Sequence, residues 1–387
     1  SVSESVDNGK VEITINILEG KKILVERVNI FGNTITEESV VRGELLLDEG
    51  DPFNLLKLEK SISKIKARNL FGKVDKIVKD GSSKDEKIID ISVEEKPTGE
   101  VAAGAGVGTD GGSFSFSIRE NNYLGSGVAV AGFTEVNENS FKGEISVNNP
   151  NYNDTGNGLN FSVASITNDE PDSGYENSII STSVGLRVEQ FERIYFKPSL
   201  SFTSDKLDVQ STASAKLKKQ AGTFNELLFG YGYIYDDRDK PFLPTDGFIT
   251  TFSQQLPMYA EAPFIKNTFK FTTYETLTED FIGSLKLLFS AINPISDEDV
   301  RLSKRLTLPR DRLRGFQRGR MGPKDGNDFI GGNYAATMNL EARLPNFLPE
   351  SSNTNVGLFV DFGNLWGVDY DSSISSSNKI RSSAGAI

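Results

Sequence analysis

The stretch from Asn333 to Leu344 reads NYAATMNLEARL, and its alternation indicates the fold of most of the chain. From Tyr334 onward apolar side chains recur at every second position, and polar ones, Asn339, Glu341 and Arg343 among them, fall between. A period of two places the two sets on opposite faces of a β-strand. The stretch therefore predicts a strand of about ten residues with one apolar and one wetted face.

The same alternation recurs along residues 98–387, in about thirteen segments separated by connectors rich in Gly, Asn, Asp, Ser and Pro. Strands in soluble sheets usually have five or six residues, whereas a tilted strand needs roughly ten to cross hydrocarbon. Closure is required because unpaired backbone groups in lipid cost several kcal/mol each. The pattern predicts an all-β transmembrane antiparallel β-barrel, and a soluble β-sandwich remains the alternative.

Composition narrows the chemistry. The 387 residues include no Cys and no His, which excludes disulfides, thiol chemistry, Cys/His zinc sites and imidazole proton relays. The net charge of −12 argues against general affinity for nucleic acid. No Walker-type phosphate loop occurs. We expect that the protein is not an enzyme and that it has no catalytic residue, no cofactor and no metal site.

Residues 21–97 mix both periods and predict a small α+β module of order β-α-α-β-β. Thr34 and Glu37 have the spacing of a capping box that opens the first helix. Residues 88–94 alternate as a half-buried strand should. The second helix is predicted from an apolar stripe formed by Leu55, Leu58, Ile62 and Ile65.

A short repeat suggests how the N-terminus is organised. The segment ITINI at 13–17 resembles IDISV at 89–93, about one module length downstream. Residues 1–20 are therefore expected to be the last strand of a preceding copy, followed by the module at 21–97 and the barrel at 98–387. Two unrelated alternating strands are the alternative.

Four short motifs stand out: ENNYLGSG at 120–127, NPNY at 149–152, the segment 237–247 and LRGF at 313–316. In the first three, Gly, Pro, Asn and Asp are sufficiently explained as turn residues. The turn positions singled out are Asn122, Gly125, Gly127, Pro150, Arg238, Pro244, Thr245 and Gly247.

Taken together and in this order, the motifs and the module make the chain resemble the BamA-type outer-membrane assembly factors of the bacterial β-barrel assembly machinery. The module resembles the POTRA domain that precedes their barrel, and the resemblance covers essentially the whole chain. It implies sixteen barrel strands, of which about 13–14 are expected here. It also implies that upstream POTRA repeats and the last strands are missing.

The resemblance implies that the sixth extracellular loop folds into the lumen, where its R-G-F tip contacts acidic residues. The corresponding positions are Arg314, Gly315, Phe316, Glu341 and Asp361. Alternation independently puts both carboxylates on the polar face. Other readings of the basic loop are a solvated surface or a site for lipopolysaccharide phosphate or RNA. The two carboxylates are an acid-base pair in a further, less favoured reading.

The first barrel strand, residues 101–108, contains only Ala, Gly and Val and should pair weakly. The positions expected at the seam are Val101, Ala103, Ala105 and Val107. The resemblance implies a lateral seam there, at which client strands are templated without ATP. Implied partners are nascent outer-membrane barrels, accessory lipoproteins and periplasmic chaperones bound through the POTRA domain, and outer-membrane lipids. The implied location is the bacterial outer membrane, with the POTRA domain in the periplasm.

Two other functions remain open. A two-partner secretion transporter of the same superfamily shares the POTRA-plus-barrel layout. A passive porin would have no need of a folded module or of a loop fixed inside the lumen.

Overall fold

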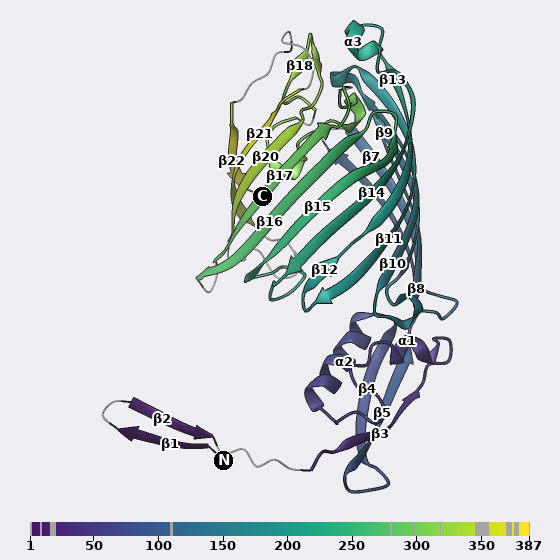
Figure 1. The fold of residues 1–387 in the computed structure, drawn as a ribbon, viewed down its shortest axis with the longest axis vertical. Coiled ribbons are helices and arrows are strands. Elements are labelled where there is room, and N and C mark those ends of the chain that lie inside the picture. The colour runs from purple at the N-terminus through teal and green to yellow at the C-terminus, as the bar shows by residue number, and fades with distance from the viewer. Residues whose placement is uncertain are drawn as a thin grey trace. The chain divides into compact units, whose positions relative to one another are not determined.

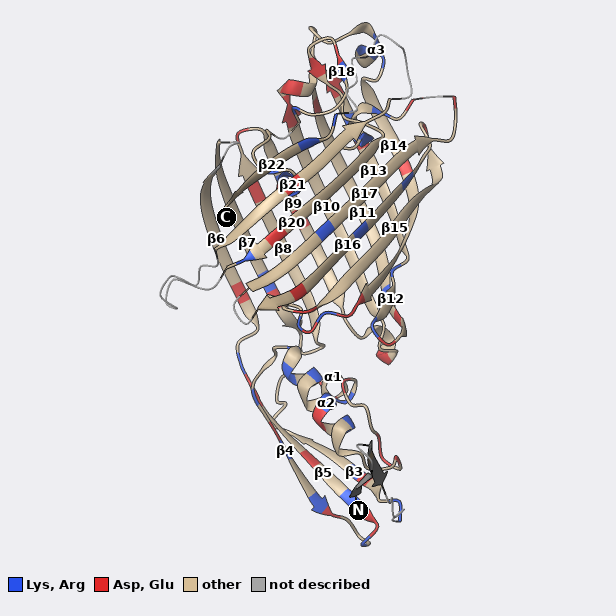
Figure 2. Ribbon diagram, turned by 90° about the vertical axis from the view of Figure 1, so that its left-hand side faces the viewer, with Lys and Arg blue, Asp and Glu red and all other residues tan. Residues whose placement is uncertain are grey.

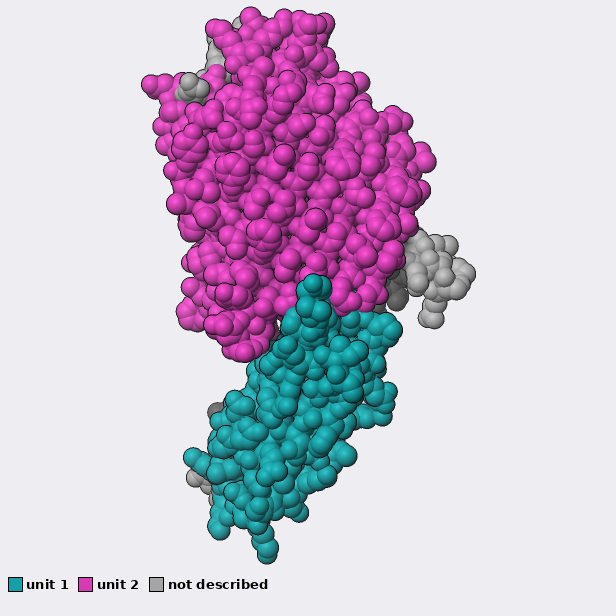
Figure 3. All heavy atoms as spheres, turned by 90° about the vertical axis from the view of Figure 1, so that its right-hand side faces the viewer, with its two compact units in different colours: residues 1–98, 121–127 teal, residues 99–120, 128–387 magenta. Residues whose placement is uncertain are grey.

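The computed structural model divides into two compact units, one of residues 1–98 with 121–127 and one of residues 99–120 with 128–387 (Figure 3). None of the helices in the described part of the chain is both long and apolar enough to cross a bilayer. The residues that the structure describes are 2–7, 10–15, 21–108, 111–278, 281–297, 299–317, 319–344, 356–368, 374 and 379–386.

The first unit contains a paired β1 and β2 and a three-stranded sheet with two helices. In the larger sheet β5 is central, parallel to β3 and antiparallel to β4, so the predicted β-α-α-β-β order is confirmed. That residues 1–20 end a preceding repeat stays a prediction, and residues 16–20 lie outside the described residues. The elements are β1 (Val2–Asp7), β2 (Lys10–Ile15), β3 (Leu24–Phe31), α1 (Glu38–Arg42), α2 (Leu55–Ala67), β4 (Phe71–Asp80) and β5 (Glu86–Glu95).

Aliphatic side chains form the core of the first unit. Leu58 and Ile65 on α2, and Ile89 and Ile91 on β5, are at most 1% exposed, and they belong to one contiguous cluster. Leu55, predicted to share the stripe of α2, is instead 54% exposed. Leu55 is the first residue of the helix, and the buried face is formed by residues from Leu58 onward.

The predicted capping box is wrong. The N-cap of α1 is Glu37, whose side chain makes no capping hydrogen bond. The Thr34 hydroxyl donates instead to the Glu95 carboxylate at 2.6 Å. Glu95 also accepts the backbone N–H groups of Ile35 and Thr36. A carboxylate sixty positions along the chain therefore fixes the segment before α1, which local spacing could not reveal.

The second unit is one antiparallel sheet that curves into a barrel wall (Figure 1). Among the described strands, β6 and β22 end the path, and each pairs on one side only. We call the end of the wall where β6 begins the near rim and the opposite end the far rim. The strands are β6 (Gly99–Gly108), β7 (Gly111–Tyr123), β8 (Val128–Asn137), β9 (Ser140–Asn149), β10 (Gly158–Glu170), β11 (Tyr175–Phe191), β12 (Ile194–Phe196), β13 (Ser199–Val209), β14 (Gly222–Asp236), β15 (Gly247–Ala260), β16 (Phe264–Thr278), β17 (Phe281–Pro294), β20 (Tyr334–Arg343), β21 (Gly357–Trp366) and β22 (Arg381–Ala386).

One pass across this wall is interrupted. β12 and β13 follow each other between the same two neighbours, β11 and β14. Pro198 lies between them and has no N–H to donate to a ladder. The Pro198 carbonyl still accepts the N–H of Leu186 at 2.9 Å. Within the described residues the sheet therefore has fourteen passes, which confirms the predicted 13–14 strands.

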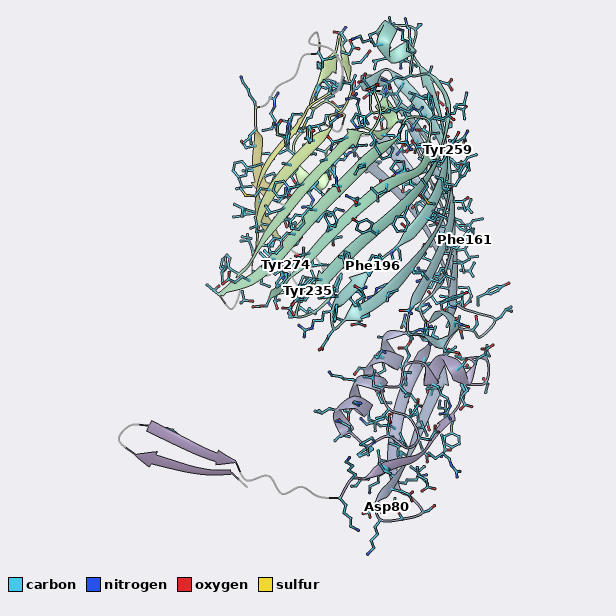
Figure 4. The ribbon with its side chains drawn as sticks, in the orientation of Figure 1. Asp80, Phe161, Phe196, Tyr235, Tyr259 and Tyr274 are labelled. Carbon is cyan, nitrogen blue, oxygen red and sulfur yellow. The ribbon has the colours of Figure 1, made fainter. Side chains whose placement is uncertain are left out.

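The outer face of the wall exposes large apolar side chains. Phe269 and Phe289 lie opposite each other on β16 and β17 and are 36% and 49% exposed. Tyr235 lies toward the near rim and Tyr259 toward the far rim (Figure 4). Aromatic side chains near both edges of an apolar band are typical of barrels whose outer face meets lipid.

Charged residues occur along the strands as isolated positions (Figure 2). Asp205, Glu226 and Asp361 on the wall are at most 1% exposed. They meet residues 295–333, which connect β17 to β20 and which we call the lumen loop. The short elements of this unit are η1 (Tyr152–Asp154), η2 (Pro171–Ser173), α3 (Ala215–Lys218), η3 (Leu302–Lys304), η4 (Arg310–Arg312), β18 (Lys324–Asp325) and β19 (Asp328–Phe329).

Candidate functional site

The lumen loop is fixed to the wall by Arg314. Its Nε donates to Asp361 Oδ2 at 2.8 Å and its Nη2 to Asp361 Oδ1 at 2.6 Å. The Arg314 backbone N–H also donates to Asp361 Oδ2, at 2.9 Å. A bidentate guanidinium-carboxylate pair is both stronger and more directional than a single contact. Because Asp361 is fully buried, the pair is also screened less than a surface pair.

Glu341 and Lys286 complete the charge balance of this site. Arg314 Nη1 lies 2.8 Å from Glu341 Oε1, and Lys286 Nζ donates to Glu341 Oε2 at 2.6 Å. The site therefore contains two cations and two carboxylates. The Arg314 guanidinium also lies over the ring of Phe359, 3.8 Å from its centroid, which adds a cation-π contact. The predicted residues Arg314, Glu341 and Asp361 are thus brought together.

Asn339 was not predicted, yet it links the loop backbone to the same carboxylate. Its Nδ2 donates to Asp361 Oδ1 at 2.8 Å and to the Arg312 carbonyl at 2.9 Å. Asn339 is fully buried and lies directly opposite Asp361 in the β20–β21 register. The sequence signal was available, because alternation puts Asn339 on the same face as Glu341.

Gly315 and Phe316 have different roles at the tip. Gly315 adopts φ of +83°, in the left-handed region that glycine tolerates best. Phe316 packs beside an apolar cluster that includes Leu313 of the loop and Leu365 of β21. The loop tip is thus held by both ionic and apolar contacts.

The rest of the basic segment is less uniform. Arg320 is paired with Asp172 at 2.8 Å, but its side chain is 52% exposed. The Arg312 side chain is only 14% exposed, and Arg318 lies outside the described residues. Arg312 and Arg314 therefore do not form a fully solvated basic surface.

The four predicted seam residues lie on β6. Val101, Ala103 and Ala105 oppose Ile118, Phe116 and Phe114 of β7. All four, including Val107, are exposed. The first strand thus offers small side chains beside a neighbour with large ones.

The turn of residues 237–246 at the near rim is tightly organised. Arg238 donates through Nε to Asp236 Oδ1 at 2.8 Å. The hydroxyl and the N–H of Thr245 donate to Asp239, and these bonds hold the pKa of Asp239 well below its usual range. Gly247 has φ of +89°, and a Cβ there would lie 2.1 Å from a backbone carbonyl oxygen.

Two further contacts reach this turn from elsewhere. Arg343, at the end of β20, donates through Nη2 to the Pro244 carbonyl at 2.8 Å. Leu243 and Pro244 also line a cavity of about 240 Å³ with Tyr274, Glu341 and Arg343. Asp239 lies within the predicted segment 237–247 but was not singled out. Arg343 was not predicted as a partner of this turn, because no local motif links residues a hundred positions apart.

Pro150 lies in the turn after β9. There the side chain of Asn149 accepts the N–H of Asn151, and that of Asn151 accepts the N–H of Gly156. These are the local side-chain-to-backbone bonds expected of turn residues.

Residues 121–127, which comprise the end of β7 and the turn after it, belong to the first unit. Asn122 is 8% exposed. Its Nδ2 donates to Thr36 Oγ1 at 2.9 Å, and its Oδ1 accepts the N–H of Gly127. The Gly125 carbonyl accepts the N–H of Glu37 at 2.9 Å. The motif thus does more than turn the chain, because it packs against the segment before α1.

The two glycines of this motif are needed for that packing. Both have positive φ, +79° at Gly125 and +68° at Gly127. A Cβ on Gly125 would lie 2.1 Å from the Ile35 carbonyl oxygen. The Gly127 carbonyl accepts a bond from Arg68 at 2.7 Å. Sequence reasoning found these residues but not their partners.

Comparison with known proteins gives matches over both units. The model described as Omp85 superfamily domain matches residues 100–387, and the POTRA model, described as surface antigen variable number repeat, matches residues 23–96. The outer membrane protein assembly factor BamA of Neorickettsia risticii (strain Illinois) is 28% identical over 406 residues, covering 98% of this chain and 52% of that protein. The chain spans about half the length of the curated BamA relatives it matches.

Solved structures show the same fold. BamA from Haemophilus ducreyi lacking POTRA domains 1–3 has a TM-score of 0.76 at 20% identity, covering 100% of this chain and 82% of that one. CdiB from Acinetobacter baumannii has a TM-score of 0.59 at 14% identity, covering 100% of this chain and 70% of that one. At these identities the likeness concerns the fold alone.

A POTRA module followed by an antiparallel barrel with an inward-folded loop defines a class of outer-membrane proteins. The family match covers more than half of the residues. The chain belongs to the Omp85 superfamily and is of the BamA type. The predicted family and fold class are therefore confirmed, and the relatives point to the outer membrane.

Proposed function

We propose that the protein folds and inserts client β-barrel proteins into the outer membrane, as the central barrel of an assembly machinery. The observation that carries this proposal is the combination of a first strand, β6, that has only small side chains from Val101 onward with a loop fixed inside the barrel by Arg314. An edge strand offers backbone groups to any incoming strand whatever its side chains. That property suits a machine with many clients.

In this proposal the POTRA domain lies in the periplasm and receives clients from chaperones, with accessory lipoproteins bound to it. No catalytic residue, cofactor or ATP is required, because the client's own folding into lipid supplies the driving force. Outer-membrane lipids surround the apolar outer face, and nucleic acid has no role.

The test measures client folding in vesicles that contain the protein. Arg314→Ala should slow the folding of several unrelated client barrels by about tenfold or more, which corresponds to about 1.4 kcal/mol. The matched control is Arg320→Ala, the same change in the same loop at an exposed pair, which should alter the rate less than about twofold. Equal rates for both variants and the unchanged protein would contradict the role of Arg314.

A dedicated secretion transporter is the second candidate, and the fold likeness to CdiB favours it. Depletion in cells separates the two. An assembly factor should lower the levels of many unrelated outer-membrane barrels together, whereas a transporter should affect one exported partner. A passive porin would instead give large, steady conductance in planar bilayers, and the loop held by Arg314 argues against it.

A further inference from the structure

The lumen loop meets the wall at a second place, far in the strand order from Arg314. There the short helix η3 lies against β13 and β14, the seventh and eighth passes, whereas Arg314 meets the twelfth and thirteenth. Residues 301–304 supply the loop side of this contact. Asp205 and Glu226 supply the wall side.

Ion pairs and one side-chain hydrogen bond join the two sides. Lys304 Nζ lies 2.8 Å from Glu226 Oε2 and 3.9 Å from Asp205 Oδ2. The Ser303 hydroxyl donates to Asp205 Oδ2 at 2.6 Å. Arg301 Nη1 lies 3.8 Å from the same oxygen. Two loop cations thus face two wall carboxylates, the same charge balance as at the Arg314 site.

Backbone and aromatic contacts hold the segment as well. The N–H of Leu302 donates to Gln220 Oε1 at 2.7 Å. The Arg301 guanidinium lies over the ring of Phe224. Leu302 is 3% exposed and packs in an apolar cluster with Leu207 of β13 and Leu217 of α3.

The burial of Asp205 and Glu226 explains why these two carboxylates require cations from the loop. Asp205 is 0% and Glu226 1% exposed. Two adjacent buried carboxylates repel each other, and each is costly to desolvate unless it is paired. Within the described residues, the cations paired with them come from the lumen loop, Arg301 and Lys304. Loss of the two loop cations with the loop still in place would leave two like charges buried together.

We propose that Lys304, Arg301 and Ser303, with Asp205 and Glu226, form a second anchor that positions the lumen loop independently of Arg314. The loop is thereby tied to two separated parts of the wall. All five are positioning residues. The inference concerns loop position in the folded chain and does not depend on the assembly activity proposed above.

The two anchors differ in geometry. Asp361 receives a bidentate pair from Arg314 and bonds from Asn339 and the backbone. In the second anchor Arg301 meets Asp205 only at 3.8 Å. The second anchor lacks a bidentate pair, and both of its cation contacts with Asp205 are at 3.8–3.9 Å, so it should yield first when the loop moves.

The absence of Cys from the chain allows a direct test. Single cysteines replace Leu302, beside the second anchor, or Leu313, beside Arg314; both are at most 3% exposed. The labelling rate with a bulky maleimide is then measured in the folded chain in vesicles. Glu226→Gln should raise labelling at 302 by about tenfold or more and at 313 by less than about threefold. Asp361→Asn should give the opposite ranking.

A double variant that exchanges the two charges is the control for misfolding. Lys304→Glu alone places a third carboxylate in the cluster and should raise labelling at 302 further. Adding Glu226→Lys restores the opposite charges and should return labelling to within about threefold of the starting rate. Unchanged labelling at 302 in Glu226→Gln and Lys304→Glu would overturn the anchor. Equal rises at 302 and 313 in every variant would overturn its independence.

Discussion

The POTRA unit and the barrel unit use the same alternating strand pattern with opposite outcomes. On β5 the apolar Ile89 and Ile91 are fully buried. On β20 the apolar Leu340 is 44% exposed, whereas the polar Asn339 beside it is fully buried. In the first unit the helices' apolar side chains cover one face of the sheet, and in the second the lumen loop does, through both ion pairs and apolar contacts. Alternation thus defines two faces of a strand, and what packs against each face decides which one is inside.

The same substitution in both units tests this contrast most strongly. Leu58→Ala removes a fully buried side chain from the POTRA core and should lower local stability by about 2–5 kcal/mol. Leu340→Ala on the outer face of the barrel should lower it by less than about 1 kcal/mol. Hydrogen exchange of α2 and of β20, followed by mass spectrometry, measures both. An equal loss of stability in Leu340→Ala would mean that the outer face of the barrel is packed like a buried core.

The packing of residues 121–127 in the first unit gives a smaller effect. Gly125→Ala combines a left-handed backbone, worth roughly 1–2 kcal/mol, with a clash against the Ile35 carbonyl. Gly50→Ala is the control, because Gly50 has φ of +89° but no atom within 4 Å of the added Cβ. Exchange of the Glu37 N–H should accelerate in the first variant only. If exchange of the Glu37 N–H accelerated equally in both variants, backbone strain alone would explain the effect, and the contact with the Ile35 carbonyl would play no part in it.

The smallest effect is expected from Glu95. Burial raises the pKa of its carboxyl group, but hydrogen bonds from Thr34, Thr36 and Ile35 outweigh burial and lower the pKa from 4.5 to about 2. Because the folded pKa is depressed, the stabilisation is present above about pH 4.5 and is lost as the pH falls toward 2. Glu95→Gln should destabilise the first unit by about 1–2 kcal/mol at neutral pH and weaken this acid dependence.

Thermal unfolding of the first unit, followed by its helical circular dichroism, measures the effect of Glu95→Gln. The control is Glu94→Gln, which removes the exposed carboxylate beside it. If both variants unfold alike at every pH, the bonds to Glu95 do not stabilise the segment before α1.

Periodicity was enough to predict the strands and their faces, because the period of two is a local property. It also put Glu341 and Asp361 on the inner face, while their pairing with Arg314 came from the family resemblance. The path of the lumen loop has no period. For that reason Asp205, Glu226 and Lys304 escaped notice, although each carries a charge that needs a partner.

The wrong capping box has the same cause. Thr34 and Glu37 have suitable spacing, but Glu95 competes for the Thr34 hydroxyl from another strand. Sequence spacing reports which local bonds are possible. Tertiary contacts decide which bonds form.

The turn at 237–246 joins β14 to β15, yet Arg343 at the end of β20 holds its Pro244 carbonyl. This contact therefore joins parts of the rim that β16 and β17 separate in the sheet. Tyr274 of β16 lines the same cavity as Pro244 and Arg343, so residues from β16, from β20 and from the turn are brought together at this part of the rim. A polypeptide entering the lumen from that end would find Pro244, Tyr274 and Arg343 occupying this part of the rim and would have more room at the other side.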